Sequence, residues 1–166
     1  MLNVYCKELR YLLKSRFYPK ITRAKKPFKH TVILGIGGNI GKDWQIIRRF
    51  DSLYLALQKD RRFCIVKSSP MIKNAAFGYT KQADFLNAVL KVKTSLHAGE
   101  ILKIMQNYEK KFGRKRSFKN APRTLDIDLL SFSAKTRQSE RLLLPHPGVH
   151  TRLSVILPLA LIQESL

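Results

Sequence analysis

The chain has 166 residues, a length that favours one domain with a sizeable core. Its 32 Lys and Arg residues outnumber 11 Asp and Glu residues, so the formal net charge is +21. Such a surface attracts nucleic acid, anionic lipid or free nucleotides, and composition does not choose among them. Two cysteines make no disulfide framework and fit a reducing cytoplasm. No run approaches the ~20 apolar residues of a membrane span.

Residues 1–30 form a basic N-terminal extension in which Glu8 is the only acid. Apolar residues at helical spacing predict an amphipathic helix over residues 4–18, followed by a linker that contains Pro19 and Pro27. Two interpretations stay open. We favour an accessory helix packed on the domain or a poorly ordered tail. The alternative is a surface that binds anionic lipid or a partner.

The folded domain is expected to span residues 31–166. Apolar alternation and continuous apolar runs predict strands at 31–34, 63–69, 85–93 and 124–132. Helical periodicity predicts helices at 44–57, with Asp43 as a possible N-cap, and at 99–112. The intervening segments are a glycine turn at 35–41, a loop at 70–84 and a very basic loop at 113–122. The order βαββαβ is typical of an α+β, ferredoxin-like sandwich with a mostly antiparallel sheet.

Two aspartates are the most informative residues. Asp126 and Asp128 alternate with Leu125, Ile127 and Leu129, so both carboxylates project from one face of a strand, roughly 7 Å apart. Two like charges that close need a positive partner, either an arginine or a divalent metal. Magnesium commonly binds through one or two carboxylates together with nucleotide phosphates. An isolated Asp-x-Asp is more often a solvated edge, but its neighbours here favour the metal.

The basic loop supplies those neighbours. It carries Arg114, Lys115, Arg116, Lys119 and Arg123, and guanidinium groups bind phosphate oxygens in bidentate fashion. Alone, this loop fits a nucleic-acid patch equally well. Because it leads directly into the two acids, which would repel a nucleic-acid backbone, a metal-bridged polyphosphate accounts better for both charges.

Other candidates are weaker in isolation. Gln106 and Glu109 lie three residues apart near the end of the second predicted helix, where surface exposure is the simpler interpretation. Phe85 and Asn87 share one face of the third strand, and an aromatic ring with an amide suits a flat heterocycle. His146 and Arg152 are possible phosphate ligands. The glycine turn lacks the spacing of phosphate-binding loops, and we interpret it as structural.

Together these residues resemble the 6-hydroxymethyl-7,8-dihydropterin pyrophosphokinases of folate biosynthesis. The matching motifs cover residues 31 to about 162 in the family's order, and they are Leu34-Gly-Ile-Gly-Gly-Asn-Ile-Gly41, Asp84-Phe-Leu-Asn87, Glu109 with Gly113-Arg-Lys-Arg116, Pro122-Arg-Thr-Leu-Asp-Ile-Asp128, Leu144-Pro-His-Pro147, and Arg152 with Pro158-Leu159.

The resemblance implies a ferredoxin-like enzyme that transfers the β,γ-diphosphate of ATP to the pterin hydroxymethyl group and releases AMP. It implies two magnesium ions held by Asp126 and Asp128, and catalytic roles for Arg114 and Arg123. The ATP-binding positions would be Gln106, Glu109, Arg114, Arg116, Arg123, Leu129, His146 and Arg152. The pterin-binding positions would be Gly78, Phe85 and Asn87. We expect a cytoplasmic monomer without a nucleic-acid partner.

The chain departs from the family pattern two residues after Arg152 and in the basic loop. Ser154 stands where the family usually has an aromatic, and Asn120 where it usually has a Trp. Two alternatives therefore stay open beside the enzyme: a basic nucleic-acid-binding protein, and a relative that binds nucleotide but is catalytically impaired.

Overall fold

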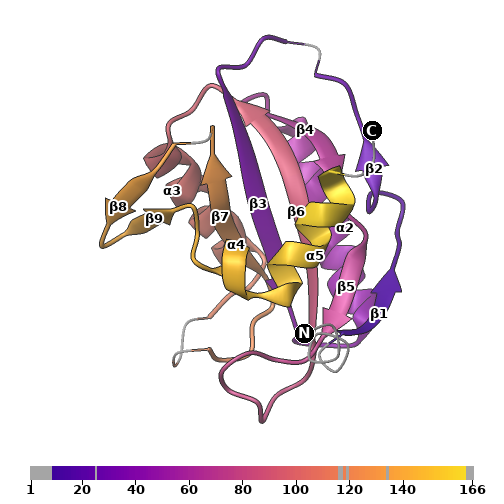
Figure 1. Cartoon of the computed structure of the whole chain (residues 1–166). Coiled ribbons are helices and arrows are strands. Elements are labelled where there is room, and N and C mark those ends of the chain that lie inside the picture. The colour runs from indigo at the N-terminus through magenta and orange to yellow at the C-terminus, as the bar shows by residue number, and fades with distance from the viewer. Residues whose placement is uncertain (1–8, 25, 116–117, 119, 134, 164–166) are drawn as a thin grey trace.

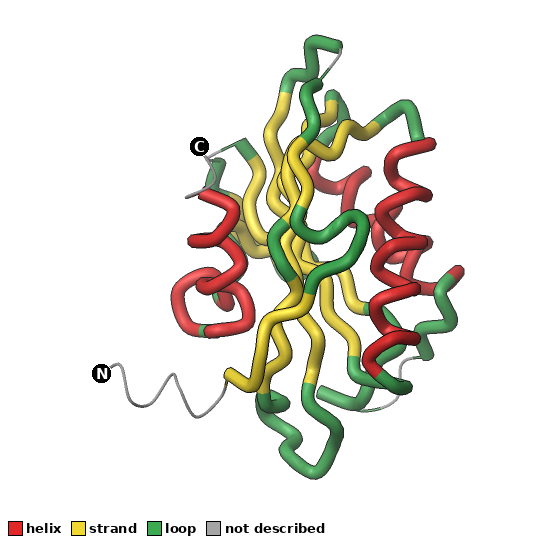
Figure 2. The backbone as a smooth tube through the Cα atoms, turned by 90° about the vertical axis from the view of Figure 1, so that its right-hand side faces the viewer, coloured by secondary structure: helices red, strands yellow, loops and turns green. Residues whose placement is uncertain are grey.

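The computed structural model describes residues 9–24, 26–115, 118, 120–133 and 135–163. A seven-stranded sheet runs through the molecule, with helices on both of its faces (Figures 1 and 2). The elements in chain order are β1 (Leu9–Leu13), β2 (Lys20–Ile21), β3 (His30–Gly38), α2 (Asp43–Lys59), β4 (Phe63–Ser68), β5 (Met71–Asn74), β6 (Phe85–Thr94), α3 (Ala98–Lys111), β7 (Asp126–Phe132), β8 (Arg137–Ser139), β9 (Leu142–Leu144), α4 (Gly148–Thr151) and α5 (Leu153–Gln163).

The main path of the sheet has the order β1-β5-β6-β3-β7, while β4 pairs with β6 and with the short β2. Every pairing in this sheet is antiparallel. The expected α+β class with a mostly antiparallel sheet is therefore confirmed. The hairpin β8–β9 forms a separate two-stranded sheet beside the edge strand β7. No helix within the described ranges is long and apolar enough to cross a membrane.

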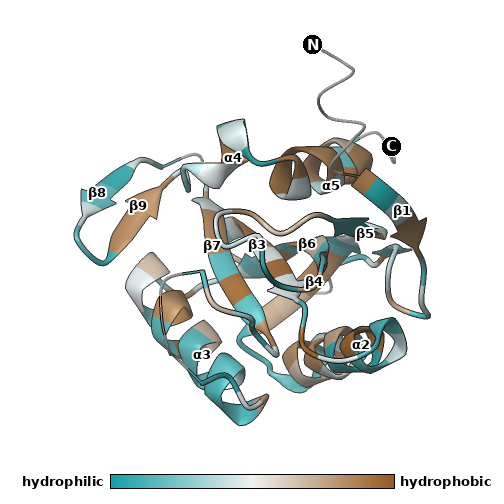
Figure 3. Cartoon of the chain, turned by 90° about the horizontal axis from the view of Figure 1, so that it is seen from below, coloured by the Kyte–Doolittle hydropathy of each residue, from teal (hydrophilic) through white to brown (hydrophobic). Residues whose placement is uncertain are grey.

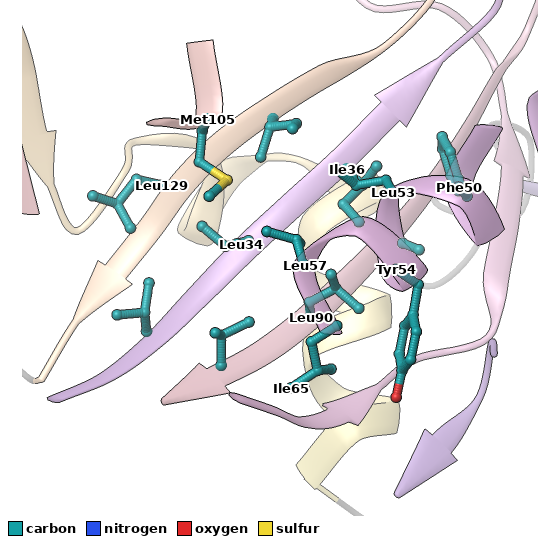
Figure 4. Packing of buried hydrophobic residues seen from close by; sticks show 14 of the residues in the cluster. Leu34, Ile36, Phe50, Leu53, Tyr54, Leu57, Ile65, Leu90, Met105 and Leu129 are labelled. Atoms are coloured by element: carbon teal, nitrogen blue, oxygen red, sulfur yellow. The ribbon is translucent and has the colours of Figure 1, made fainter. Parts of the chain in front are cut away.

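The larger core lies between the sheet and the helices α2 and α3, which cover one face (Figure 3). The buried residues of α2 recur three or four positions apart and face the sheet: Ile46, Phe50, Leu53, Tyr54 and Leu57. They pack with strand residues such as Leu34, Ile65 and Leu90 (Figure 4). On α3 the buried stripe continues from Ile101 and Met105 to Glu109, so helical periodicity carries a carboxylate to the edge of the core.

The opposite face is covered by α4 and α5 (Figure 3). Val89 of β6, Leu130 of β7 and Ile162 of α5 are the buried centre of a second, smaller cluster. On this face α5 contacts both β6 and β5.

The prediction of a helix over residues 4–18 is wrong for those of its residues that the structure describes. Residues 9–13 are the strand β1, and residues 4–8 lie outside the described ranges. The register pairs Leu9 with Asn74 and Leu13 with Met71 of β5. Phe17 and Tyr18 are buried in the main core, where Phe17 stacks on Tyr54 at a centroid distance of 4.8 Å. The open edge of β5 and these two aromatic anchors override the helical periodicity.

Three further expectations need correction. The first four residues of the glycine turn expected at 35–41 are the end of β3, which extends to Gly38. The loop expected at 70–84 begins with the strand β5, and residues 137–144 form a hairpin that the sequence analysis missed. Asp43 is the first residue of α2 rather than its N-cap. Its carboxylate accepts hydrogen bonds from Tyr11 Oη at 2.6 Å and from Lys73 Nζ at 2.7 Å.

Candidate functional site

The site is built on one row of residues across three strands. Gly37 of β3 lies directly opposite Asn87 of β6 and opposite Asp126 of β7. Directly opposed residues of antiparallel strands project to the same face, so the amide and the carboxylate share a face, about 10 Å apart across two strand spacings. Gly37 between them carries no side chain. We call this row the floor of the site; it has an amide at one end, a carboxylate at the other and a glycine between them.

Glycines are required on this floor by close contacts. A Cβ at Gly37 would approach Asn87 Oδ1 to 2.8 Å, and a Cβ at Gly38 would approach the Thr124 carbonyl oxygen to 2.8 Å. Gly35, one row further along, lies opposite Asp128. A Cβ at Gly35 would approach the Leu130 side chain to 3.1 Å, so the glycines are structural, as expected.

Asp126 is held between two arginines. It is 9% exposed, and one carboxylate oxygen lies 2.5 Å from Arg114 Nη1, while the other contacts Arg123 Nη1. Arg114 also forms an ion pair with Glu109. The residues that the sequence placed on a helix, a basic loop and a strand therefore form one charged cluster at the edge of the sheet.

Asp128 has a different environment. Within the described residues its carboxylate forms no ion pair and accepts no hydrogen bond. Burial raises its pKa, and the negative charge of Asp126 raises it further, whereas His146, Arg152 and Arg123 act in the opposite direction. Asp128 is thus a carboxylate whose charged form lacks a direct partner, which favours binding of a cation.

Glu109 serves as a connector between α3 and β7. Its Oε1 accepts a hydrogen bond of 2.8 Å from the backbone N–H of Ile127, the residue between the two aspartates. Burial raises the pKa of Glu109 to about 7, against the lowering effects of the Ile127 N–H and Arg114 and with a further raising effect from Asp126. Glu109 is therefore not a surface residue, and its contact fixes the strand that carries both aspartates.

The donor set fits magnesium. Among the described residues there is no group of three or more His, Cys, Asp or Glu side chains arranged to hold a metal ion. The two neighbouring carboxylates supply hard oxygen ligands, and magnesium in nucleotide sites characteristically takes its remaining ligands from phosphates and water. Asp126 and Asp128 therefore fit a magnesium ion that enters with a nucleotide. Arg114 and Arg123 could then contact phosphate oxygens in place of the Asp126 carboxylate.

A groove leads away from Asp128 between α3 and the β8–β9 hairpin. A cavity of about 300 Å³ is lined by Asp128, Leu129 and His146 together with the hairpin. A neighbouring cavity of about 880 Å³ is lined by Gln106 on the α3 side and by Arg137 and Arg141 on the hairpin side. Five residues line both cavities, so they form one continuous groove: Leu102, Ser139, Glu140, Arg141 and Leu142. Its volume and its basic wall fit an extended anionic ligand.

A second, small cavity lies at the amide end of the floor. It measures about 70 Å³ and is lined by two aromatic residues, Phe77 and Phe85, by polar residues and by two arginines: Asn74, Asn87, Asn120, Arg123 and Arg152. The Asn87 amide donates a 2.6 Å hydrogen bond to Asn74 Oδ1. Phe77 is 67% exposed, and the Arg152 guanidinium lies 4.9 Å from its ring centroid. Ser154 lines the same cavity, so Phe77 and Phe85 are the aromatic residues that share it with the position that lacks one.

The two loops around this cavity are joined to each other. Gln82 Nε2 donates to the backbone oxygens of Tyr79 and Asn120, and its Oε1 accepts from Asn39 Nδ2 at 2.8 Å. Asn39 Oδ1 in turn accepts from the backbone N–H of Arg123 at 2.9 Å. A Cβ at Gly78, where φ is +79°, would meet Asn120 Nδ2 at 2.4 Å. The loop that contains Gly78 therefore packs against the end of the basic loop.

The structure brings most of the sequence-predicted residues together. Asp126, Asp128, Glu109, Arg114 and Arg123 form the charged cluster, Gln106, Leu129 and His146 line the groove, and Gly78, Phe85, Asn87 and Arg152 surround the small cavity. Arg116 lies outside the described residues.

Sequence reasoning missed two contributors. Arg141 and its neighbours on the hairpin were missed because strands of three residues give no usable periodicity. Phe77 was treated as part of an irregular loop. Two features of the sequence could have indicated Phe77: it is an aromatic residue next to Gly78, and Ser154 stands where the family usually has an aromatic.

Comparison with known proteins adds independent findings. The sequence model of the family described as 7,8-dihydro-6-hydroxymethylpterin-pyrophosphokinase matches residues 33–164. A 2-amino-4-hydroxy-6-hydroxymethyldihydropteridine pyrophosphokinase of Campylobacter jejuni is 46% identical over 154 residues, which cover 93% of this chain and 96% of the relative. The proteins of the same name from Helicobacter pylori and Bacillus subtilis are 39% and 36% identical over 93% and 76% of this chain, and over 94% and 74% of their own lengths.

The comparisons differ in how much of the N-terminal segment of this chain they cover. The family match begins at residue 33. The Campylobacter and Helicobacter alignments cover more of this chain than residues 31–166 contain, so both reach into the segment before Thr31. This segment is therefore outside the family match but is shared with some relatives.

Proposed function

The chain belongs to the 7,8-dihydro-6-hydroxymethylpterin-pyrophosphokinase family, and we propose that it transfers the β,γ-diphosphate of ATP to 6-hydroxymethyl-7,8-dihydropterin. The hydroxymethyl oxygen forms a bond to the β-phosphorus. The bond between that phosphorus and the α,β-bridging oxygen breaks, AMP leaves, and the hydroxyl proton is released. The observation that carries this proposal is the row Asn87–Gly37–Asp126, which places an amide beside a cavity with aromatic walls about 10 Å from a carboxylate pair.

The carboxylates form the phosphate end of the site. Asp126 and Asp128 would hold magnesium, and we infer two ions from the pair of acids and from the family. When bound, magnesium neutralises phosphate charge and lowers the pKa of a coordinated hydroxyl. Asp128 is available for this role because no described residue donates to it. Glu109 keeps both acids in place through its hydrogen bond to Ile127.

The arginines provide positive charge that is already in position. Arg114 and Arg123 both contact Asp126 and would turn toward phosphate oxygens when magnesium takes that carboxylate. Their task in the transition state is to stabilise charge on the transferred group, since diphosphoryl transfer needs positioning and electrostatics more than covalent catalysis. No side chain is positioned as an obvious general base, and we assign none.

The groove and the small cavity would each hold one of the two substrates. The groove lined by Gln106, Leu129, His146 and Arg141 would hold ATP, with Arg116 and Arg152 as further nucleotide contacts inferred from the family. The small cavity would hold the pterin, with Asn87 reading the ring edge and Phe85 lying against its face. A bicyclic pterin exceeds 70 Å³, so we infer that the loop with Phe77 and Gly78 moves outward to admit it.

The finer architectural assignments are also proposals. The order β7-β3-β6-β4, with α2 and α3 on one face, supports a ferredoxin-like sandwich. We also propose that the protein is a cytoplasmic monomer that does not require nucleic acid. The basic residues that line the groove, Lys103, Arg137 and Arg141, support a polyphosphate as its ligand.

Two forms of labelled ATP test the reaction. With β-labelled and γ-labelled ATP in separate assays, both labels should appear in the pterin product, in amounts equal to the AMP formed. Transfer of the γ label alone, with ADP as product, would identify an ordinary kinase. Magnesium-dependent ATP binding without transfer of either label would indicate the catalytically impaired relative.

A further inference from the structure

The N-terminal strand β1 pairs with β5, the strand beside the cavity proposed for the pterin. β5 lies between β6 and β1, and its last residue, Asn74, pairs with Phe85 on one side and with Leu9 on the other. The same Asn74 accepts the hydrogen bond that orients the Asn87 amide. Without β1, the strand that carries Asn74 would be the open edge of the sheet.

A second contact reaches the other end of the same loop. The loop after β5 spans residues 75–84, and Arg10 Nε lies 2.9 Å from Asp84 Oδ2 at its exit. Leu9 lies at its entrance through the pairing with Asn74. Neighbouring residues of β1 therefore fix both ends of the loop that carries Phe77 and Gly78.

The strand β1 is itself anchored independently of this loop. Tyr18 is fully buried against Phe50 and Tyr54, and Ser15 Oγ donates a 2.6 Å hydrogen bond to Asp51. Tyr11 reaches the Asp43 carboxylate, which also binds Lys73 of β5. These contacts connect β1 to α2, so the restraint on the loop is transmitted to the core of the domain.

We propose that β1, and Arg10 in particular, is a positioning element for the pterin substrate. Arg10 and Leu9 hold the two ends of loop 75–84, and this keeps Phe77 and Gly78 over the cavity and Asn74 against Asn87. The inference rests on the proposed function. It gives the N-terminal segment, which lies outside the family match, a role in substrate binding rather than that of an accessory tail.

The effect of one contact is moderate because the pair is partly exposed. The side chains of Arg10 and Asp84 are 47% and 31% exposed, and such pairs change an equilibrium by about two- to fivefold. Arg10→Gln should raise the KM for the pterin by about that factor and leave the KM for ATP unchanged. Arg10→Gln combined with Tyr11→Phe, which removes both side-chain tethers, should raise it further, and Arg10→Lys should restore part of the loss.

Arg23→Gln is the matched control, because it removes the same charge from an exposed position of the same segment. It should leave both KM values unchanged. A double-mutant cycle of Arg10→Gln with Asp84→Asn should show that the two changes are not additive, since either one alone already removes the ion pair.

Hydrogen exchange provides a readout that does not depend on turnover. Amides of residues 75–84 should exchange faster in the Arg10→Gln/Tyr11→Phe protein than in the unsubstituted chain, while those of α3 should not change. If the double variant loses thermal stability but keeps both its pterin KM and the exchange rates of residues 75–84, the strand is only structural and the inference is wrong. Absence of pterin turnover by the unsubstituted chain would instead refute the proposed function, while the exchange rates would still decide whether β1 holds the loop.

Discussion

Neutralising Asp128 should raise the thermal stability of the protein, whereas neutralising Asp126 should lower it. Both carboxylates should nevertheless be needed for activity. The Asp128→Asn variant loses a partly buried charge that has no direct partner among the described residues and that is repelled by Asp126. At roughly 7 Å and an effective dielectric constant of about 20, that repulsion is about 2 kcal/mol, and the nearby cations reduce the net gain to about 1 kcal/mol. The apo protein should therefore melt a few degrees higher, since 1 kcal/mol corresponds to about 2–4 °C in a chain of this size.

In Asp126→Asn, the same isosteric change removes the shared partner of Arg114 and Arg123. Breaking a buried ion pair costs about 3–5 kcal/mol, and we expect about 2–3 kcal/mol because the two arginine side chains are 18% and 25% exposed. This variant should melt several degrees lower. Both variants should lose about 10³-fold or more in kcat, which corresponds to about 4 kcal/mol of transition-state stabilisation through magnesium.

Calorimetry without ligands, together with steady-state kinetics at saturating magnesium and ATP, measures both effects. A destabilised Asp128→Asn protein would mean that Asp128 has a stabilising partner, contrary to its surroundings in the structure. Turnover near that of the unsubstituted chain in both variants would remove the metal role from this strand.

Three further changes test other parts of the site. Arg123→Ala should lower kcat by about 10²-fold and change the KM for ATP little, because its charge acts on the transferred phosphates, and an effect on KM alone would contradict this role. Phe77→Ala should raise the KM for the pterin by about two- to tenfold without changing that for ATP, with Trp44→Ala as an exposed aromatic control, and equal KM values in Phe77→Ala and the unsubstituted chain would exclude stacking. Glu109→Gln should remove a pH dependence of stability. The folded-state pKa of Glu109 is raised from 4.5 to about 7, so the native protein retains a proton that the unfolded chain releases, and stability declines as pH rises through this window, by at most about 1.4 kcal/mol per unit. Urea unfolding at pH 5 and pH 7 measures the slope, and an unchanged slope in Glu109→Gln would exclude Glu109 as its source.

The clustering of the acidic strand with the basic loop could be predicted from sequence because the two segments are adjacent in the chain. Asp126 and Asp128 share a face by strand periodicity alone, and their proximity to Arg114 and Arg123 follows from the short basic loop. What the sequence did not reveal is that, of the two aspartates, Asp126 alone is paired with arginines among the described residues, since this depends on where the end of α3 places Arg114 relative to β7.

The errors in the fold arise where tertiary contacts override local pattern. Leu9, Leu12 and Leu13 fit a helix as well as a strand, and the open edge of β5 selects the strand. The glycines of β3 have low strand propensity, yet the approach of Asn87 and of Thr124 requires them within the strand. β5 has four residues after a proline, and the hairpin strands have three each, too few to show alternation.

Phosphorus NMR of the purified chain with ATP, magnesium and 6-hydroxymethyl-7,8-dihydropterin tests the central claim most directly. The account predicts that the three ATP resonances are replaced by those of AMP and of a diphosphate monoester on the pterin, and that Asp128→Asn leaves ATP unchanged over the same period. Unchanged ATP with the unsubstituted chain, or the appearance of ADP in place of AMP, would contradict diphosphoryl transfer at this site.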